Sequence, residues 1–426
     1  MTTTKNNEHK KLNFSNEREQ SQACLNSAEH EKNQGRKVLN VPNLRFPEFQ
    51  GKWEYFLIND VCSEFKSGKN IKADSVFECG EYPVYGGNGL RGYTSSYNHE
   101  GSYVLIGRQG ALCGNVRSVY GKTYITEHAI AVAGNEKSNT SFLHYLFLKM
   151  NLGQYSDQSA QPGLAVNKLL KLKVALPIIS EQTKIAKLLS LLDERISTQS
   201  KIIEDLKKLK SAIVEKVFCS PNQEYPMCRI EGFEQALSTY KMSDFSSRIA
   251  TKNKDSKCSL VLTIAAQYGL VNQESFFNKS VASENLTGYY LLHKGEFAYN
   301  RSYSAGYDWG AVKRLDNYDE GVLSTLYICF KINETIVDSD YLAYYFESSK
   351  WHKGLSDIAG EGARNHGLLN VSITDYFNTK HRFPVIEEQK AIAKMLNTIT
   401  EKERKATLLG ECYQKQKQYL LRQMFI

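Results

Sequence analysis

Apolar residues recur along two long stretches of the chain with the spacing of a helix that packs along one side. In the first stretch, which begins at Glu181, they follow alternating four- and three-residue steps, as in a coiled-coil seam. The seam positions are Leu189, Leu192, Ile196, Ile203, Leu206, Ile213 and Val217, with Ile202, Leu209 and Val214 widening the stripe. Gln199 and Lys210 interrupt it. The pattern predicts one long helix that ends near Phe218.

The second stretch is a copy of the first. Residues 176–218 and 383–425 align without a gap at an offset of 207, and 13 of the 43 positions are identical. Both copies begin PxxxEQ, which is typical of a helix start because proline and acidic residues suit the first turn. The second seam contains Leu396, Ile399, Ala406, Tyr413, Leu420 and Met424, interrupted by Glu403, Gly410 and Lys417. Two unrelated surface helices are the alternative, which the shared spacing disfavours.

The segment between the helices predicts how they pair. Residues 219–382 amount to a globule with a radius of gyration of about 15 Å, whereas each helix is about 57 Å long. A parallel pair would force the globule to span that length, so we expect antiparallel pairing. The predicted fold is α+β, with two α/β globular domains separated by two long helices that form an antiparallel coiled coil. Its shape would be a dumbbell with a pseudo-two-fold axis.

Composition shifts divide the chain into five parts. Residues 1–40 are polar and predict a disordered tail. The first globule covers 41–175, the central helix 176–218, the second globule 219–382 and the last helix 383–426. Both globules open with the same short lead-in, because Arg45, Phe49 and Asp60 align with Arg229, Phe233 and Asp244 at an offset of 184.

The overall composition is that of a cytoplasmic globular protein, with 41% hydrophobic and 23% charged residues among 426. No apolar run approaches the length of a membrane span, so we expect no membrane partner. The nine cysteines include no CxxC pair, which favours free thiols in a reducing compartment.

A glycine-rich loop in the first globule carries the first candidate contact residues. Gly87, Gly89 and Gly92 have GxGxxG spacing, but the following residues 93–97 continue as strand or loop, whereas a dinucleotide site needs a helix there. A plain hairpin and a loop that approaches base edges remain the two interpretations. For the second interpretation the candidates are Tyr85, Asn88, Arg91 and Tyr93. Arg108 and Gln109, at the end of a predicted strand, have donors suited to guanine and adenine edges.

The second globule has a similar texture of short β-rich runs, with a helix expected near residues 340–351. Its polar reading candidates are Arg301, Tyr303, Arg364 and Asn365. The net charge of +8 is compatible with nucleic acid without requiring it.

Catalytic signatures are absent from the sequence. There is no Walker A motif, GxSxG, HExxH or methyltransferase Asn-Pro-Pro-aromatic motif, so we predict no catalytic residues, no metal site and no cofactor.

The two globules, each followed by a PxxxEQxxIAxxL helix, resemble the specificity subunit of a Type I restriction-modification enzyme. YPVYGGNG and IGRQGA in the first globule and YNRSYS, GVLSTLY and GARNHGLLNVS in the second carry the likeness. The resemblance implies that two target-recognition domains each read one half of an asymmetric, interrupted site in double-stranded DNA. It also implies that the helices act as a spacer and dock two methyltransferase subunits, with ATP-dependent restriction subunits reached through the complex. The alternatives are a coiled-coil scaffold with two protein-binding globules and an enzyme with an unrecognised site.

Overall fold

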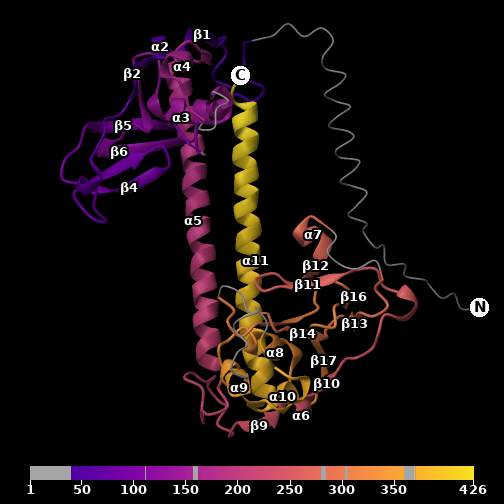
Figure 1. The fold of residues 1–426 in the computed structure, drawn as a ribbon. Coiled ribbons are helices and arrows are strands. Elements are labelled where there is room, and N and C mark those ends of the chain that lie inside the picture. Colours follow the sequence, from indigo (N-terminus) through magenta and orange to yellow (C-terminus); the bar gives the residue numbers. More distant parts are fainter. Residues whose placement is uncertain are drawn as a thin grey trace, which may run out of the picture. The chain divides into compact units, whose positions relative to one another are not determined.

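The computed structural model describes residues 40–110, 112–156, 162–279, 285–302, 306–358, 369 and 371–426. The predicted tail, apart from Asn40, lies outside the described residues. The fold is α+β, as predicted (Figure 1), and the chain divides into two compact units, the first of which is discontinuous in sequence. Unit 1 consists of Met1–Ile196 and Cys412–Ile426, and unit 2 of Ser197–Glu411. Each long helix therefore contributes one end to each unit.

The elements of unit 1 are mostly strands. They are β1 Glu54–Leu57, β2 Cys62–Ser67, β3 Tyr82–Gly86, β4 Gly89–Thr94, β5 His99–Gly107, β6 Val116–Ile125, β7 Ala129–Gly134 and β8 Lys173–Leu176. The helices are α2 Ile58–Val61, α3 Thr140–Met150 and α4 Val166–Leu169, with 3-10 turns η1 Ala73–Ser75 and η2 Leu152–Tyr155. The long helices are α5, Ile179–Val217, and α11, Ile386–Gln423.

Unit 2 contains more and shorter elements. Its strands are β9 Ser238–Lys241, β10 Ser246–Arg248, β11 Leu262–Ala265, β12 Gly269–Asn272, β13 Tyr290–His293, β14 Phe297–Asn300, β15 Ala311–Arg314, β16 Glu320–Leu323, β17 Ile328–Ile332 and β18 Lys380–Phe383. Its helices are α6 Met242–Phe245, α7 Gln273–Phe277, α8 Ser339–Tyr345, α9 His352–Ser356 and α10 Ile373–Asn378, with the 3-10 turn η3 Lys254–Ser256. The helix expected near 340–351 is α8, which stops at Tyr345.

One six-stranded sheet, ordered β2-β7-β5-β6-β3-β4, dominates unit 1. Its neighbours are antiparallel except for β3 and β6. Because side chains alternate along a strand, Val104 and Ile106 of β5 join the main core with α3, while Leu105 joins a smaller cluster with Val119 and Ala131. Both faces of the second half of β5 are thus covered, which explains why residues 104–106 form a continuous apolar run.

In unit 2 a four-stranded sheet is ordered β10-β17-β14-β15, and β11-β12 and β13-β16 form separate two-stranded sheets. The main core lies between this sheet, α8 and the adjoining ends of the long helices, and is rich in aromatic side chains. Tyr299, for example, stacks on Tyr376 with ring centroids 4.9 Å apart.

The repeated lead-ins and the repeated helix starts contact each other in the same way in both units. In unit 1, Arg45 Nη2 lies 2.7 Å from Glu181 Oε2, and Arg45 Nε donates to Oε1 of the same carboxylate. In unit 2, Arg229 makes the same two contacts with Glu388. Both glutamates are buried, at 0% and 1% exposed. The acidic residue of each PxxxEQ motif is therefore half of a bidentate ion pair that joins the lead-in to the helix.

The glutamine that follows each buried glutamate fixes a second helix. Gln182 Oε1 accepts from the backbone N–H of Asn139, whose side chain caps α3. Gln389 Oε1 accepts in the same way from Asp338, whose side chain caps α8. Each PxxxEQ motif thus satisfies buried polar groups at the start of its own helix and at the N-terminus of the neighbouring one.

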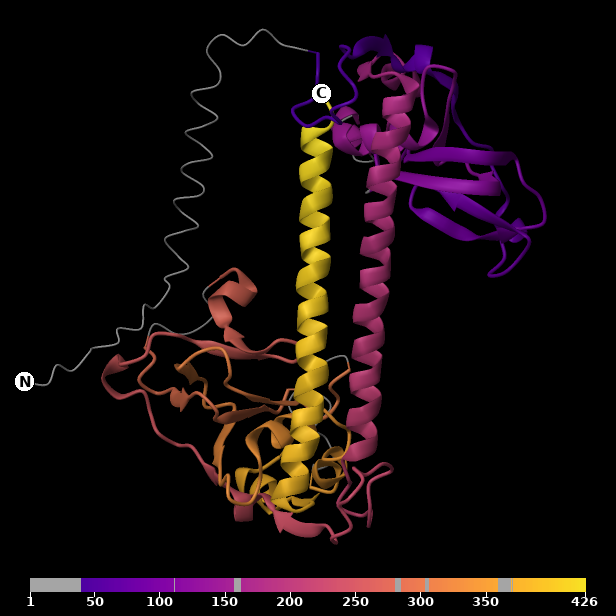
Figure 2. The ribbon, with the colours of Figure 1, turned by 180° about the vertical axis from the view of Figure 1, so that it is seen from behind.

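The far end of each long helix packs in the unit where the other helix begins. In unit 1 the ring of Phe425, just after α11, stacks on Phe142 of α3 with centroids 5.1 Å apart. In unit 2 the ring of Phe218, just after α5, lies 5.0 Å from Tyr341 of α8. The yellow end of α11 accordingly runs beside the magenta start of α5 (Figure 2). The helices are antiparallel, as predicted.

Polar side chains repeat along with the aromatic ones. Tyr145 of α3 donates to Asp193 of α5, and Lys417 of α11 lies 5.7 Å from the Tyr145 ring centroid. Its repeat partner Lys210, of α5, lies 5.8 Å from the ring of Tyr344 in α8. These two lysines, which interrupt the predicted seams, therefore make matching cation-π contacts.

The burial of α5 follows most of the predicted seam. Leu189, Leu192, Val214 and Val217 are buried, and Ile196, Ile203, Leu206 and Ile213 are half-buried. The predicted widening is wrong at two positions, because Ile202 is 43% and Leu209 is 50% exposed. With a single partner helix over this stretch, only the narrow seam is covered. No helix among the described residues is long and apolar enough to cross a membrane.

Candidate nucleic-acid interface

The glycine-rich loop of unit 1 is the turn between β3 and β4, which pair as an antiparallel hairpin. A strand, not a helix, follows Gly92, so the glycine spacing does not build a dinucleotide site. Gly87 lies against the backbone of the β6–β7 turn and of the residue that follows β5, because a Cβ added there would be 2.7 Å from the carbonyl oxygen of His128 and 3.5 Å from the nitrogen of Arg108. Only glycine allows the hairpin tip to approach so closely.

This approach gathers three of the predicted residues. Asn88 is exposed at the hairpin tip, next to Gly87, and Arg108 and Gln109 follow the end of β5. The backbone N–H of Arg108 donates to the carbonyl of His128 at 2.9 Å, and its carbonyl accepts from Leu164. Guanidinium and amide groups suited to base edges therefore stand at one end of the sheet, on a hydrogen-bonded backbone.

His128 belongs to this cluster although we did not predict it. Its Nδ1 lies 3.3 Å from Gln109 Oε1, and its Nε2 lies 3.1 Å from Glu127 Oε1. The imidazole thus connects Gln109 to a carboxylate. The sequence held a signal, because Glu127 and His128 are polar residues inside an otherwise β-rich run and mark the turn between β6 and β7.

A second residue absent from our prediction is Arg117, on β6. Gly89 has φ +108°, and a Cβ there would be 3.0 Å from Arg117 Cζ. The exposed guanidinium therefore lies against the start of β4.

The other predicted residues of unit 1 lie along the hairpin. Arg91 is exposed, with its Cδ 2.9 Å from where a Cβ of Gly86 would stand. Tyr85 is half-buried against the small cluster around Leu105. Tyr93 is half-buried, and its backbone pairs with Phe77.

In unit 2 only Arg301 of the predicted residues lies within the described ranges; Tyr303, Arg364 and Asn365 lie outside them. Arg301 Nη1 donates to the carbonyl of Val371 at 3.1 Å, and Nη2 donates to the carbonyl of Leu326 at 3.1 Å. Its guanidinium ties three segments of unit 2 together.

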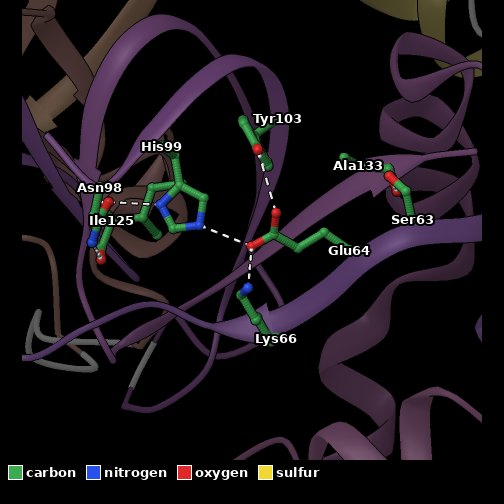
Figure 3. Close-up of polar contacts among 8 residues, drawn as sticks. All are labelled: Ser63, Glu64, Lys66, Asn98, His99, Tyr103, Ile125 and Ala133. Carbon is green, nitrogen blue, oxygen red and sulfur yellow. Dashed lines mark hydrogen bonds and ion pairs between the residues drawn. The ribbon is translucent and has the colours of Figure 1, made fainter.

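A polar network supports the sheet of unit 1 next to the small cluster (Figure 3). Glu64 of β2 contacts Tyr103 and His99 of β5 at 3.3 and 3.0 Å, reaching across the intervening strand β7. The small side chain of Ala133, which pairs with Glu64, leaves room for this contact. Burial raises the pKa of Glu64, but hydrogen bonds from Lys66 and His99 outweigh it and hold the pKa below its usual value. The network links the edge strand to the strand that leads to Arg108.

No cluster of three or more histidine, cysteine, aspartate or glutamate side chains suited to a metal ion occurs in the described part of the chain. Within the same ranges the cysteines are free.

Comparison with known proteins finds a match over the region that contains the candidate residues of unit 1. A protein-family model for the Type I restriction modification DNA specificity domain matches residues 50–208. The chain carries that domain. The resemblance to Type I specificity subunits predicted from the sequence is thereby confirmed for the region that the family model matches.

Two named relatives agree. The Type I restriction enzyme EcoprrI specificity subunit of Escherichia coli is 42% identical over 153 residues, which cover 35% of this chain and 37% of that protein. The chain thus matches just over a third of this relative's length. A protein of Haemophilus influenzae, provisionally named a type I restriction enzyme specificity subunit, is 22% identical over 363 residues, or 82% of this chain and 89% of the relative.

A solved structure has the same fold. The crystal structure of a Type I restriction-modification S subunit from M. genitalium aligns with a TM-score of 0.61 and 16% identity, covering 91% of this chain and 99% of that one. All candidate residues of unit 1 lie inside the specificity domain, and those of unit 2 lie beyond it.

Proposed function

We propose that the chain is the DNA specificity subunit of a Type I restriction-modification complex, with unit 1 reading one half of an asymmetric, interrupted site and unit 2 reading the other. The observation that carries the proposal is the gathering of Asn88, Arg108 and Gln109 at one end of a sheet within the specificity domain. Amide and guanidinium groups discriminate base pairs in the major groove, whereas lysine and arginine contacts to phosphates only fix register.

The chain itself carries out no methylation, cleavage or ATP hydrolysis in this proposal. The long helices dock two methyltransferase subunits, and restriction subunits join through the complex. Activity of any of these kinds in the purified chain would contradict the proposal.

The experiment is methylation-site mapping on random-core DNA with the full chain and its methyltransferase partner. Wild type should select two half-sites separated by a fixed gap. Gln109→Ala should relax one base position in one half-site, with a loss of discrimination of about 1–3 kcal/mol, and leave the other half-site unchanged. Lys122→Ala is the control, because Lys122 lies near the opposite end of β5, where it pairs with Glu100.

The outcomes separate the alternatives. Binding without sequence selection, or protein partners that bind independently of DNA, would favour the scaffold interpretation. Loss of both half-sites at once in Gln109→Ala would show that the residue supports the fold and does not read a base.

The helices would set the gap. Seven residues inserted in each, near Gln199 and near Ala406, keep the seam period and add about 10 Å, roughly three base-pair steps. We expect a longer gap with unchanged half-sites. A changed half-site at constant gap would contradict a spacer role.

A further inference from the structure

The helix pair has one buried hydrogen bond in its seam, within unit 2. Gln199 is 8% exposed, and its Nε2 donates to the carbonyl oxygen of Ala406 at 3.0 Å. The glutamine that interrupts the predicted seam is therefore satisfied inside it. A buried polar group that bonds only in one arrangement specifies register.

The residues around this hydrogen bond differ in size between the helices. Ala406 and Gly410 are the repeat counterparts of Gln199 and Ile203, at the offset of 207. A Cβ added to Gly410 would lie 3.4 Å from Gln199 Cγ and 3.7 Å from Ile203 Cδ1. We call the contact between these four residues the crossing. At the crossing α5 supplies the large side chains and α11 supplies the small ones.

We propose that this large-to-small crossing makes α5 select the α11 of its own chain over the α5 of a second copy. Two α5 helices paired in the same geometry would place Gln199 and Ile203 against their own copies, in space now left by Ala406 and Gly410. Such overpacking is destabilising. Two α11 helices would leave a void there, which also destabilises. Only the mixed pair fills the crossing.

This preference for a mixed pair matters because the two helices share their seam spacing. On spacing alone, α5 could pair with another α5, and α11 with another α11. Pairing of α5 with the α5 of a second copy would join two molecules through the same element, related by a two-fold axis. The crossing disfavours that homotypic pairing and favours a pair of one α5 with one α11. This inference goes beyond the proposed function, since it holds whether or not the units bind DNA.

The experiment moves the large side chains from one helix to the other in the full-length protein. One variant makes α5 small, with Gln199→Ala and Ile203→Ala. Another makes α11 large, with Ala406→Gln and Gly410→Ile. The third carries all four substitutions and restores a large-to-small crossing with the sides exchanged. Denaturation midpoints and light-scattering masses are measured for each.

We expect both two-residue variants to unfold at lower denaturant, and the four-residue variant to regain at least about half of the lost midpoint with the same light-scattering mass as wild type. A milder cycle of Gln199→Ala, Ala406→Gln and the double variant should show the same rescue if the larger changes prevent folding. The control exchanges Ile202→Leu and Leu409→Ile, repeat counterparts that are both 43% exposed, and should show no coupling. Additive effects in both cycles would overturn the proposal.

Discussion

Unit 1 and unit 2 are alike where the chain repeats and differ where it does not. Each has an arginine paired with a buried glutamate, a glutamine on the cap of a short helix, and an aromatic ring from the far end of a long helix. Arg45 and Glu181 are 136 residues apart, whereas Arg229 and Glu388 are 159 apart. The same contacts therefore enclose segments of different length.

The sheets show where the extra residues go. The order β2-β7-β5-β6 in unit 1 corresponds to β10-β17-β14-β15 in unit 2. Unit 1 extends this sheet with β3 and β4, and unit 2 instead has the separate pairs β11-β12 and β13-β16. In unit 1 the added hairpin carries Asn88 and Arg91, so the units differ at the place where candidate base-reading groups stand. A common frame with unlike additions is consistent with the proposed reading of two different half-sites.

The largest effect should come from removing the aromatic ring at the end of either helix. Phe218 and Phe425 are 1% and 3% exposed, so Phe218→Ala or Phe425→Ala should each cost about 4 kcal/mol. If the repeated contacts play the same part in both units, hydrogen exchange should rise chiefly around α8 in Phe218→Ala and around α3 in Phe425→Ala.

Tyr419→Ala is the control for these variants, because that ring on α11 is 54% exposed. It should change the free energy of unfolding by no more than about 0.5 kcal/mol. Equal exchange throughout the chain in both phenylalanine variants would show that the units unfold together and that the comparison by unit fails.

The buried ion pairs should rank next. Arg45→Ala and Arg229→Ala each leave a buried carboxylate without its cation, which should cost about 3 kcal/mol in denaturant unfolding. Lys208→Ala breaks only an exposed i,i+4 pair with Glu204 and should cause no measurable loss of stability. Clearly unequal losses in the two arginine variants would mean that the two ion pairs are repeated in sequence but contribute differently to the free energy of unfolding.

The sequence predicted the parts of this frame that depend on local pattern. The two helices follow from apolar spacing, and the lead-in repeat follows from Arg45 and Arg229. That each arginine binds the glutamate of a PxxxEQ motif was beyond reach, because such long-range contacts depend on tertiary packing. The same holds for Gln199, whose partner is a backbone carbonyl and leaves no trace in the side-chain pattern.

The sequence predicted only part of the candidate interface, because some of its contacts also depend on tertiary packing. Arg108 and Gln109 stood out because they end a strand, and the glycine spacing marked the hairpin. His128 was missed because only the closure of β7 onto β5 brings it to Gln109. Arg301 looked like a free reading group, yet its guanidinium bonds to two carbonyls that lie far from it in sequence.

Acid should weaken both units through histidines whose pKa is lowered in the folded protein. Burial lowers the pKa of His144 in unit 1 to about 4 and that of His381 in unit 2 to about 3, against about 6.5 in the unfolded chain. The unfolded state binds more protons between these values, so stability is full above pH 6.5 and falls as the pH drops toward 4. We expect a loss of about 1–2 kcal/mol for each histidine from pH 7 to pH 5.

His144→Phe separates the two contributions. It should reduce the pH dependence of unfolding for unit 1 and leave that of unit 2 intact, as followed by hydrogen exchange at pH 7 and pH 5. An unaltered profile in His144→Phe would assign the acid sensitivity of unit 1 to other groups.

The smallest effect on stability is expected for a methyl group added at the crossing between α5 and α11. Gly410→Ala places a methyl group at ordinary contact distance from Gln199 and Ile203, and alanine is about 1 kcal/mol better than glycine inside a helix. The variant should therefore gain about 0.5–1 kcal/mol in denaturant unfolding, where Gly410→Ile loses stability. Gly354→Ala in α9, whose Cβ would have its nearest neighbour 3.7 Å away, measures the helix preference alone. A loss in Gly410→Ala beside a gain in Gly354→Ala would mean that the crossing has no room even for a methyl group and excludes a second α5 more strictly.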